Sequence, residues 1–311
     1  MATTLTVNSN YSGSASSEII GAAFKEADTI SKNLVTVMPD IDFQISLRKI
    51  AYTDGRVDYT CGFTPTGAVT LSERLLTPKK LKNEQTICKE DLRQIWSSSS
   101  MGFSAHNDNM PKDVEAALLN EILMDTAEAT DLDIWQGVAA TTGRIGGFIE
   151  LFTADAAVIK ANNGIVPAAA AITKANVQTE IEKVLDAVPV ALRRKSDMVF
   201  AVSANVALAY EQALISAGIS NGMGGATKEL AYGSTKIDVI NGLPDNTIVV
   251  YQVKNLVFGC SLNSDFNSVR IKDMDESDLS GNVRFKMTYS AAVNYINSED
   301  VVWYLSTTAV V

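Results

Sequence analysis

Cysteine and histidine are scarce in this chain, and their scarcity removes several classes of site. The 311 residues include three cysteines and one histidine. Cys61, Cys88 and Cys260 lie far apart and form no CxxC or Cys/His pair, so the sequence predicts neither a zinc site nor a disulfide framework and favours a reducing compartment. His106 lies in the polar stretch 104–108, which is typical of a surface loop. We expect no catalytic centre and no cofactor.

Cations and long apolar runs are also in short supply. The chain has 26 basic and 36 acidic residues, a formal net charge of −10. This balance argues against a sequence-independent nucleic-acid binder, whose affinity comes from Lys and Arg on phosphates, but it does not exclude a local basic strip. No apolar run approaches the length of a membrane span, and the N-terminus lacks the basic start and apolar core of a signal peptide. We therefore expect synthesis in the cytoplasm and no membrane partner.

Two short motifs suggest ligand sites but fail on their spacing. Residues 222–228 are Gly-rich, yet Lys228 follows Thr rather than Gly, and the preceding pattern is a helix rather than the strand that a phosphate loop requires. The acidic run 273–278 resembles the start of a calcium loop. Its sixth position is Asp278 rather than Gly and its twelfth is Arg284 rather than Glu, which excludes an EF-hand and leaves at most a chance surface cation.

The first third of the chain predicts an arm, a helix and a hairpin. Residues 1–17 are polar and cannot bury enough surface to order alone. Residues 18–34 carry apolar side chains three and four apart, which predicts a short amphipathic helix. From 43 to 76 the pattern alternates with period two, and Thr53-Asp54-Gly55-Arg56 reads as the turn of a long hairpin that includes Val57 and Tyr59. Residues 87–96 suggest a short helix.

The middle of the chain predicts helices and α/β structure. Apolar residues recurring every three or four positions indicate a helix over 111–136, with Ile122 on its buried face and acids on the other. Gly143, Gly146 and Gly147 end that unit. Between 173 and 241 the sequence predicts a helix capped by Thr173, a buried strand at 197–202 and, after Ser203, a helix stopped by Gly218.

Charge is unevenly distributed around these elements. Residues 74–89 contain five basic residues and one acid, and residues 112–136 contain seven acids and one base. Solvated faces are the usual meaning of such runs. On an oligomerising chain, complementary patches of this kind would also suit a contact between neighbouring copies.

The last quarter has a characteristic order of segments. Residues 242–246, Gly-Leu-Pro-Asp-Asn, lead into the β-prone runs 247–253 and 256–259; the acidic turn, a long β-prone run from Val283 to Tyr295 and a closing segment at 299–305 follow. With the preceding arm, hairpin, acidic helix and α/β insert, this order resembles the major capsid proteins of tailed bacteriophages with the HK97 shell fold. The resemblance covers about Ile41 to Leu305.

This resemblance implies an α+β fold in five parts. These are an N-terminal arm (1–40), an E-loop hairpin (41–90), a P-domain with a long spine helix (91–172), an A-domain (173–265) and C-terminal strands that complete both domains (266–311). It further implies an icosahedral shell of hexamers and pentamers that encloses double-stranded DNA without sequence-specific binding. We expect a virion protein with a separate scaffolding protein, a portal and decoration proteins, and with non-covalent shell contacts.

The resemblance also assigns site residues. The E-loop of one subunit would lie over the spine helix of the next, which would bring the basic and acidic runs together. The expected contact residues are Arg74, Lys79, Lys80, Lys82, Glu121, Asp125, Glu128 and Asp131. The loop containing Gly218, Gly222, Gly224 and Gly225 would lie near the capsomer axis, where small residues let several copies crowd together.

Three other classes of protein compete with this interpretation. An encapsulin-like compartment would share the fold but hold protein cargo. A phage tail-tube or adhesin protein could share the β-rich C-terminus but would lack the long helix after the hairpin. An enzyme is the least favoured class, because no cluster of His, Cys or carboxylates is evident in the sequence.

Overall fold

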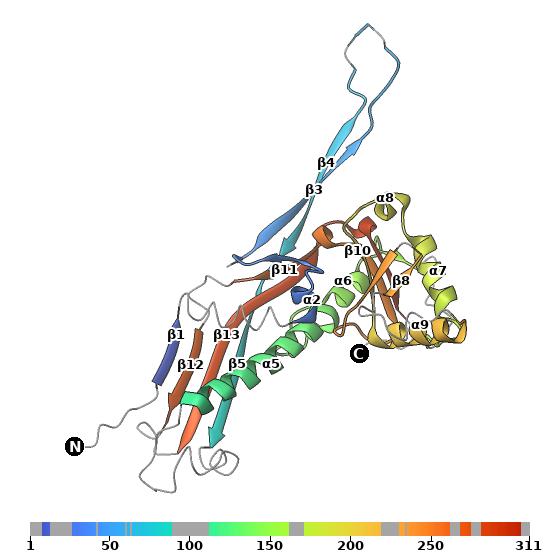
Figure 1. The fold of residues 1–311 in the computed structure, drawn as a ribbon. Coiled ribbons are helices and arrows are strands. Elements are labelled where there is room, and N and C mark those ends of the chain that lie inside the picture. The colour runs from blue at the N-terminus through green and yellow to red at the C-terminus, as the bar shows by residue number, and fades with distance from the viewer. Residues whose placement is uncertain are drawn as a thin grey trace, which may run out of the picture.

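A computed structural model describes the fold over most of the chain (Figure 1). The described residues are 8–12, 27–41, 43–59, 61–62, 64–88, 112–161, 171–218, 230–233, 235–261, 268–274 and 281–305. Within them the chain forms two six-stranded sheets and a separate two-stranded hairpin, with the long helix α5 lying along the first sheet.

The first sheet is built around one long strand. Its strands are β1 (Asn8–Ser12), β2 (Thr36–Met38), β5 (Lys79–Cys88), β11 (Leu256–Cys260), β12 (Ser268–Asp273) and β13 (Asn282–Tyr295). β13 pairs with β5, β12 and β11, so it joins a segment of the first third of the chain to segments of the last quarter. Along β13 the side chains alternate: Val283, Phe285 and Met287 are buried, whereas Arg284 and Lys286 are exposed. This period of two indicates one face packed on the core and one face turned to solvent.

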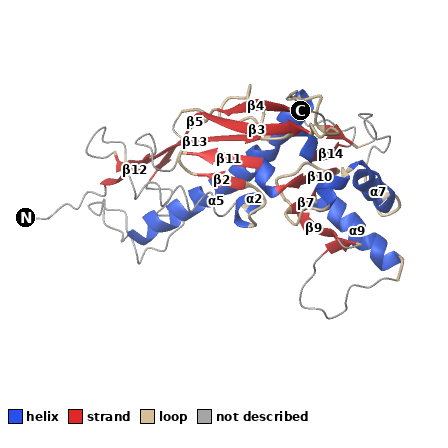
Figure 2. Ribbon diagram, turned by 90° about the horizontal axis from the view of Figure 1, so that it is seen from above, coloured by secondary structure: helices blue, strands red, loops and turns tan. Residues whose placement is uncertain are grey.

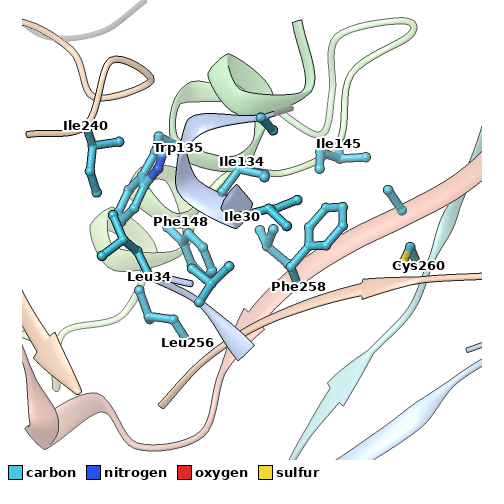
Figure 3. Packing of buried hydrophobic residues seen from close by; sticks show 14 of the residues in the cluster. Ile30, Leu34, Ile134, Trp135, Ile145, Phe148, Ile240, Leu256, Phe258 and Cys260 are labelled. Carbon is cyan, nitrogen blue, oxygen red and sulfur yellow. The ribbon is translucent and has the colours of Figure 1, made fainter. Parts of the chain in front are cut away.

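Helices cover the buried face of this sheet. They are α2 (Asp28–Ser31), α5 (Lys112–Gln136) and α6 (Phe148–Ala154). Trp135, fully buried near the end of α5, packs against the rings of Phe148 and Tyr251 at centroid distances of 5.3 and 6.0 Å, and its indole Nε1 donates to Thr29 Oγ1 at 2.8 Å. Figure 3 shows Trp135 and Phe148 among the apolar side chains of this core. The predicted helix over 111–136 is confirmed.

The second sheet lies between two cores. Its strands are β6 (Ile159–Lys160), β7 (Met198–Val202), β8 (Leu230–Tyr232), β9 (Thr235–Val239), β10 (Thr247–Gln252) and β14 (Val301–Leu305). Val249 and Tyr251 of β10 join the core under α5, whereas Ile248 and Val250 face a second core formed with α7 (Val177–Ala187) and α9 (Ala204–Ser216). Burial on both faces explains why residues 248–251 of β10 form a continuous apolar run. Three short elements flank these strands: α8 (Val190–Arg193) precedes β7, η1 (Val253–Asn255) follows β10, and η2 (Ser298–Asp300) precedes β14.

The hairpin projects away from the body of the molecule (Figures 1 and 2). Its strands, β3 (Ile45–Thr53) and β4 (Ala68–Leu76), pair along their whole length, from Ile45 opposite Leu76 to Thr53 opposite Ala68. Only the root packs on the rest of the chain, where Leu47 and Leu76 join Ile41, Val257 and Ala292 in a small core.

Several predicted boundaries differ from the structure. The sequence predicted a turn at residues 53–56. In the structure β3 ends at Thr53, which pairs with Ala68, the first residue of β4, so the connection is the longer segment 54–67. Val57 and Tyr59 therefore lie outside the strands. Residues 87 and 88 end strand β5 instead of starting a helix, because β13 pairs with them. The helix expected over 18–34 is seen only at 28–31 among the described residues, and Asn176 rather than Thr173 is the N-cap of α7.

The segment predicted as the A-domain also includes one strand of the first sheet. Residues 256–260, assigned from the sequence to the segment 173–265, form β11 and pair with β13 in the first sheet. The chain crosses from one sheet to the other at η1, directly after β10. Ser203 is the N-cap residue of α9, and Gly218 follows its last turn with φ of 73°, as predicted.

Candidate functional site

The hairpin has two unlike faces. On one face the exposed apolar side chains of β3 and β4 form a ladder, in which Ile50 stands opposite Leu71 and Tyr52 opposite Val69. These four side chains and Leu75 are between 52% and 72% exposed. The other face carries Leu47 and Leu76 at the root and polar residues beyond them. Apolar side chains gathered on one face of a projecting hairpin are typical of an interaction surface.

The root of the hairpin is held by a polar cluster. The Arg74 guanidinium pairs with the Asp155 carboxylate and stacks on the Tyr295 ring, 4.2 Å from its centroid. The Tyr295 hydroxyl donates to the same Asp155 oxygen at 2.7 Å. In addition, Asn294 Nδ2 donates to the Leu75 carbonyl at 2.8 Å, and Lys49 Nζ donates to Asn297 Oδ1 at 2.6 Å. These contacts fix the direction in which the hairpin leaves the body.

Asp155 is the group on which this cluster depends. Its burial raises the pKa of the carboxyl, but the Ala157 N–H, the Tyr295 hydroxyl and Arg74 together outweigh that effect and hold the pKa below its ordinary value of 3.8. A depressed pKa means that the ionised form stabilises the fold. That contribution is complete above the unfolded-state pKa and is lost as the pH falls through the folded-state value.

We therefore expect Asp155→Asn to destabilise the protein at neutral pH. Because it removes the charged partner of Arg74, the free energy of unfolding should fall by about 1–3 kcal/mol at pH 7. Urea denaturation at pH 7 and at successively lower pH should show this deficit shrinking as the pH falls through the folded-state pKa, where the wild-type carboxyl becomes protonated as well. Glu73→Gln, on the exposed part of β4, is the matched control and should stay within about 0.5 kcal/mol of wild type. A deficit that does not change with pH would contradict this role.

The predicted basic run is divided between two sides of the first sheet. Arg74 belongs to the root cluster. Lys79 points to the α5 side, where its Nζ donates to the carbonyls of Ala139, Thr141 and Arg144 at 3.0, 3.3 and 2.6 Å. Lys80 and Lys82 are exposed on the opposite face. Arg74 and Lys79 thus bind to the body of the subunit, whereas Lys80 and Lys82 lie at the surface, where Lys82 pairs with Glu84 at 2.7 Å.

The predicted acidic run is divided as well. Glu121, Asp125 and Glu128 are exposed on α5 and line a groove of about 560 Å³, together with Asp28 and the exposed Met124. Asp131, expected on the same solvent face, is instead 5% exposed, and its Oδ1 accepts from the Thr29 N–H at 2.9 Å. The reason is tertiary: α2 packs over the last turns of α5 and covers this position.

Other chemistries find no support in the described residues. No three His, Cys, Asp or Glu side chains converge there to hold a metal ion. Gly218-Ile219-Ser220-Asn221-Gly222 fits the spacing of a nucleophile elbow, but it follows helix α9, whereas that motif requires a preceding strand. His106, Gly222, Gly224 and Gly225 lie outside the described residues. Within the same described ranges, no helix has the length and apolarity needed to cross a bilayer.

Sequence reasoning missed two parts of this surface. Asp155 and Tyr295 are 140 residues apart, and no local pattern joins them. Four exposed cations of β12 and β13 were also missed, although the alternation in Arg270-Ile-Lys272 and Arg284-Phe-Lys286 is the signal for cations on one face of a strand.

Comparison with known proteins identifies the fold. Neither a protein-family model nor a curated protein sequence matches the chain. Among solved structures, it is similar to the capsid of a native GTA particle, at 13% identity and a TM-score of 0.63 over 90% of this chain and 89% of that chain. It is similar to a chain of the satellite phage P4 procapsid that includes the size determination protein, at 10% identity and a TM-score of 0.58 over 92% of this chain and 97% of that chain. A third similar structure is the SrpI encapsulin complex from Synechococcus elongatus, at 11% identity and a TM-score of 0.52 over 91% and 89% of the two chains. The chain therefore has the α+β, HK97-like fold that these shell proteins share.

Proposed function

We propose that this chain is the major structural subunit of an icosahedral bacteriophage head that encloses double-stranded DNA. The observation that carries the proposal is the likeness to phage and GTA capsid structures over about nine tenths of both chains. The projecting hairpin supports it, because none of the residues that the structure describes covers its exposed apolar ladder, and such a surface suits a partner molecule. In this role the protein is a virion component with a structural, non-catalytic task.

The parts of the fold correspond to the parts of such a subunit. Residues 1–40 form the N-terminal arm, and 41–90 form the E-loop, with β3 and β4 as its projecting hairpin. Residues 91–172 form the P-domain with α5 as its spine helix. Residues 173–265 form the A-domain, except that β11 belongs with the P-domain sheet, and residues 266–311 complete both domains. Hexamers and pentamers would form through non-covalent contacts, aided by separate scaffolding, portal and decoration proteins.

The contact residues act on two sides of the shell wall in this proposal. Lys80 and Lys82 contact neighbouring subunits on the side on which the hairpin root packs. Glu121, Asp125 and Glu128 contact them on the side of α5. Arg74, Lys79 and Asp131 support those surfaces from within the subunit. An acidic wall toward the packaged DNA suits the function, because like charge keeps the DNA from adhering to the shell.

The loop that contains Gly218, Gly222, Gly224 and Gly225 lies near the capsomer axis in this proposal. The support is that the loop follows α9 in the sequence, and α9 packs with α7 on the second sheet. A structure of the assembled shell with this loop at the capsomer periphery would overturn the assignment.

Electron microscopy of the purified protein tests the proposed function. We expect negative-stain images of the protein, expressed alone or with its neighbouring structural genes, to show closed shells of uniform diameter. Only dispersed monomers or open tubes under all conditions would refute it. The likeness to an encapsulin supports one alternative, a compartment for protein cargo. Nuclease-protected DNA inside native particles favours the phage head, and a co-purifying enzyme favours the compartment.

A further inference from the structure

A group of backbone carbonyls surrounds the side-chain ammonium of Lys79. Lys79 is the first residue of β5, and its Nζ reaches the loop that follows α5. There it donates to the carbonyl oxygens of Ala139, Thr141 and Arg144 at 3.0, 3.3 and 2.6 Å. An ammonium group has three donors and no acceptor, so three carbonyls can satisfy it fully. We name the segment that supplies these oxygens the carbonyl loop: residues 137–147.

The carbonyl loop is held in shape by its own backbone. The Gly147 N–H donates to the Gly137 carbonyl at 2.7 Å, which closes the two ends of the loop onto each other. Neither glycine leaves room for a side chain: a Cβ at Gly137 would collide with the Ile145 carbonyl, and a Cβ at Gly147 would lie 2.7 Å from the Gly137 nitrogen. Within the loop, the Thr141 N–H donates to the Val138 carbonyl at 2.9 Å. None of these contacts involves Lys79, so the loop can keep its carbonyls together when the ammonium is absent.

The chemistry of the site suits a monovalent cation. Its three oxygens are uncharged carbonyls, the kind of ligand that replaces the hydration shell of potassium in selective channels. Calcium and magnesium are instead bound largely through carboxylates. Potassium and ammonium ions are similar in size, whereas a lithium ion is much smaller and would need the carbonyls to move closer together. The geometry that fits the Lys79 ammonium therefore also fits a potassium or a free ammonium ion.

Asp133 adds a negative charge beside the carbonyl loop. Burial is the largest influence on the pKa of this carboxyl and raises it, while the positive charges of Arg144 and Lys79 act in the opposite direction. The Arg144 guanidinium lies near the same carboxylate, with Nε 3.7 Å from Asp133 Oδ1. The carboxylate thus attracts the cation that the carbonyls hold, without being one of its direct partners.

The cation connects two segments that are far apart in the sequence. Lys79 and Arg144 are 65 residues apart. The hairpin strand β4 ends at Leu76, so Lys79 follows it almost directly, whereas the carbonyl loop follows α5. Residues 139–144 of the loop are exposed. A cation between the loop and β5 therefore holds an exposed loop in one conformation next to the point where the chain returns from the hairpin.

We propose that the carbonyl loop is a monovalent-cation site, which the Lys79 ammonium fills in the wild-type protein and which potassium or ammonium ions fill when this side chain has no charge. The site lies within one subunit, so it does not depend on the proposed function. The protein carries its own cation and needs no potassium for this loop. Removal of the charge at residue 79 makes the order of the loop depend on the ions in solution.

Hydrogen exchange of the Lys79→Met variant tests this site. Methionine keeps an unbranched apolar side chain but has no ammonium. In choline chloride, peptides that cover 137–147 should exchange at least about tenfold faster than in wild type, because the loop opens more often. Potassium or ammonium chloride at about 200 mM should restore exchange to within about threefold of wild type, whereas lithium chloride should not, since only an ion that binds the native loop stabilises it. Thermal unfolding checks that the variant folds.

Lys82→Met is the matched control. Lys82 is exposed on the opposite face of the same strand, so its removal should leave exchange of the carbonyl loop equal in all four chlorides. Rescue of Lys79→Met by every salt alike would show an effect of ionic strength only and would refute the site. Fast exchange that no salt corrects, or exchange equal to that of wild type in choline chloride, would refute it as well.

Acetylation of the wild-type protein gives a readout that needs no variant at residue 79. With limiting acetic anhydride, Lys79 should react at least about tenfold more slowly than Lys82, because all three hydrogens of its Nζ are donated to the loop. Mass spectrometry of the digested protein measures the two rates. Equal rates would mean that the carbonyls do not enclose the ammonium in solution, and the proposal would be wrong.

Discussion

Removing the distal hairpin is expected to abolish particle formation without unfolding the subunit. Replacing residues 52–69 by an Asn-Gly turn keeps the strand pairs from Ile45–Leu76 to Ala51–Thr70 and the polar root cluster. It removes Tyr52, Val69 and the two acids of the tip, none of which belongs to a core of the described structure. Velocity sedimentation should show only small species, and the thermal midpoint should stay within about 4 °C of wild type, which corresponds to less than about 1 kcal/mol.

A pair of point variants distinguishes the loss of the ladder from the loss of length. Leu71→Asp places a charge in the apolar ladder, opposite Ile50, and should prevent assembly. Thr70→Asp changes the next residue of the same strand but points to the polar face, so it should assemble. Equal behaviour of the two variants would show that the ladder is merely solvated.

Truncating Trp135 is expected to have the largest effect on stability. The Trp135→Ala variant removes a fully buried ring that packs on Phe148 and Tyr251, and it leaves Thr29 Oγ1 without its donor. Such a change costs about 3–5 kcal/mol, a large share of the roughly 5–15 kcal/mol by which domains are stable. Equilibrium urea denaturation should show the lower midpoint.

Leu132→Ala supplies the control for Trp135→Ala. Leu132 lies one turn earlier on α5 and is 39% exposed, so its truncation removes less buried area. We expect a loss below about 1.5 kcal/mol. A Trp135→Ala loss no larger than that of Leu132→Ala would mean that the two sheets are not held together through this ring.

The sequence located elements whose pattern is local and missed those that depend on distant partners. Helix α5 shows a repeat of apolar residues every three to four positions, and residues 248–251 of β10 form an apolar run because both faces of the strand are buried. Strand β5 begins with two lysines after Pro78 and was not predicted, because its conformation depends on pairing with β13, roughly 200 residues later.

In the candidate site, too, features with a local sequence pattern were predicted and features that depend on distant segments were missed. The acidic face of α5 was correctly placed at Glu121, Asp125 and Glu128, since helical spacing alone puts them together. Asp131 continues that spacing but is buried, because a segment a hundred residues earlier covers it. The charge of 74–89 was counted as one strip, whereas strand alternation sends Lys79 and Lys80 to opposite sides of the sheet. A count of charge along the chain cannot separate the two sides until the strand is known.

The position of β13 in the chain also governs when the first sheet can form during synthesis. The hairpin forms from residues 45–76 by local pairing, so it can be complete early in synthesis. Strand β5 pairs with β13, which is translated roughly 200 residues later, so the first sheet can close only well after the hairpin has formed. A nascent chain that has passed the hairpin therefore carries a paired hairpin while β5 still waits for its partner strand.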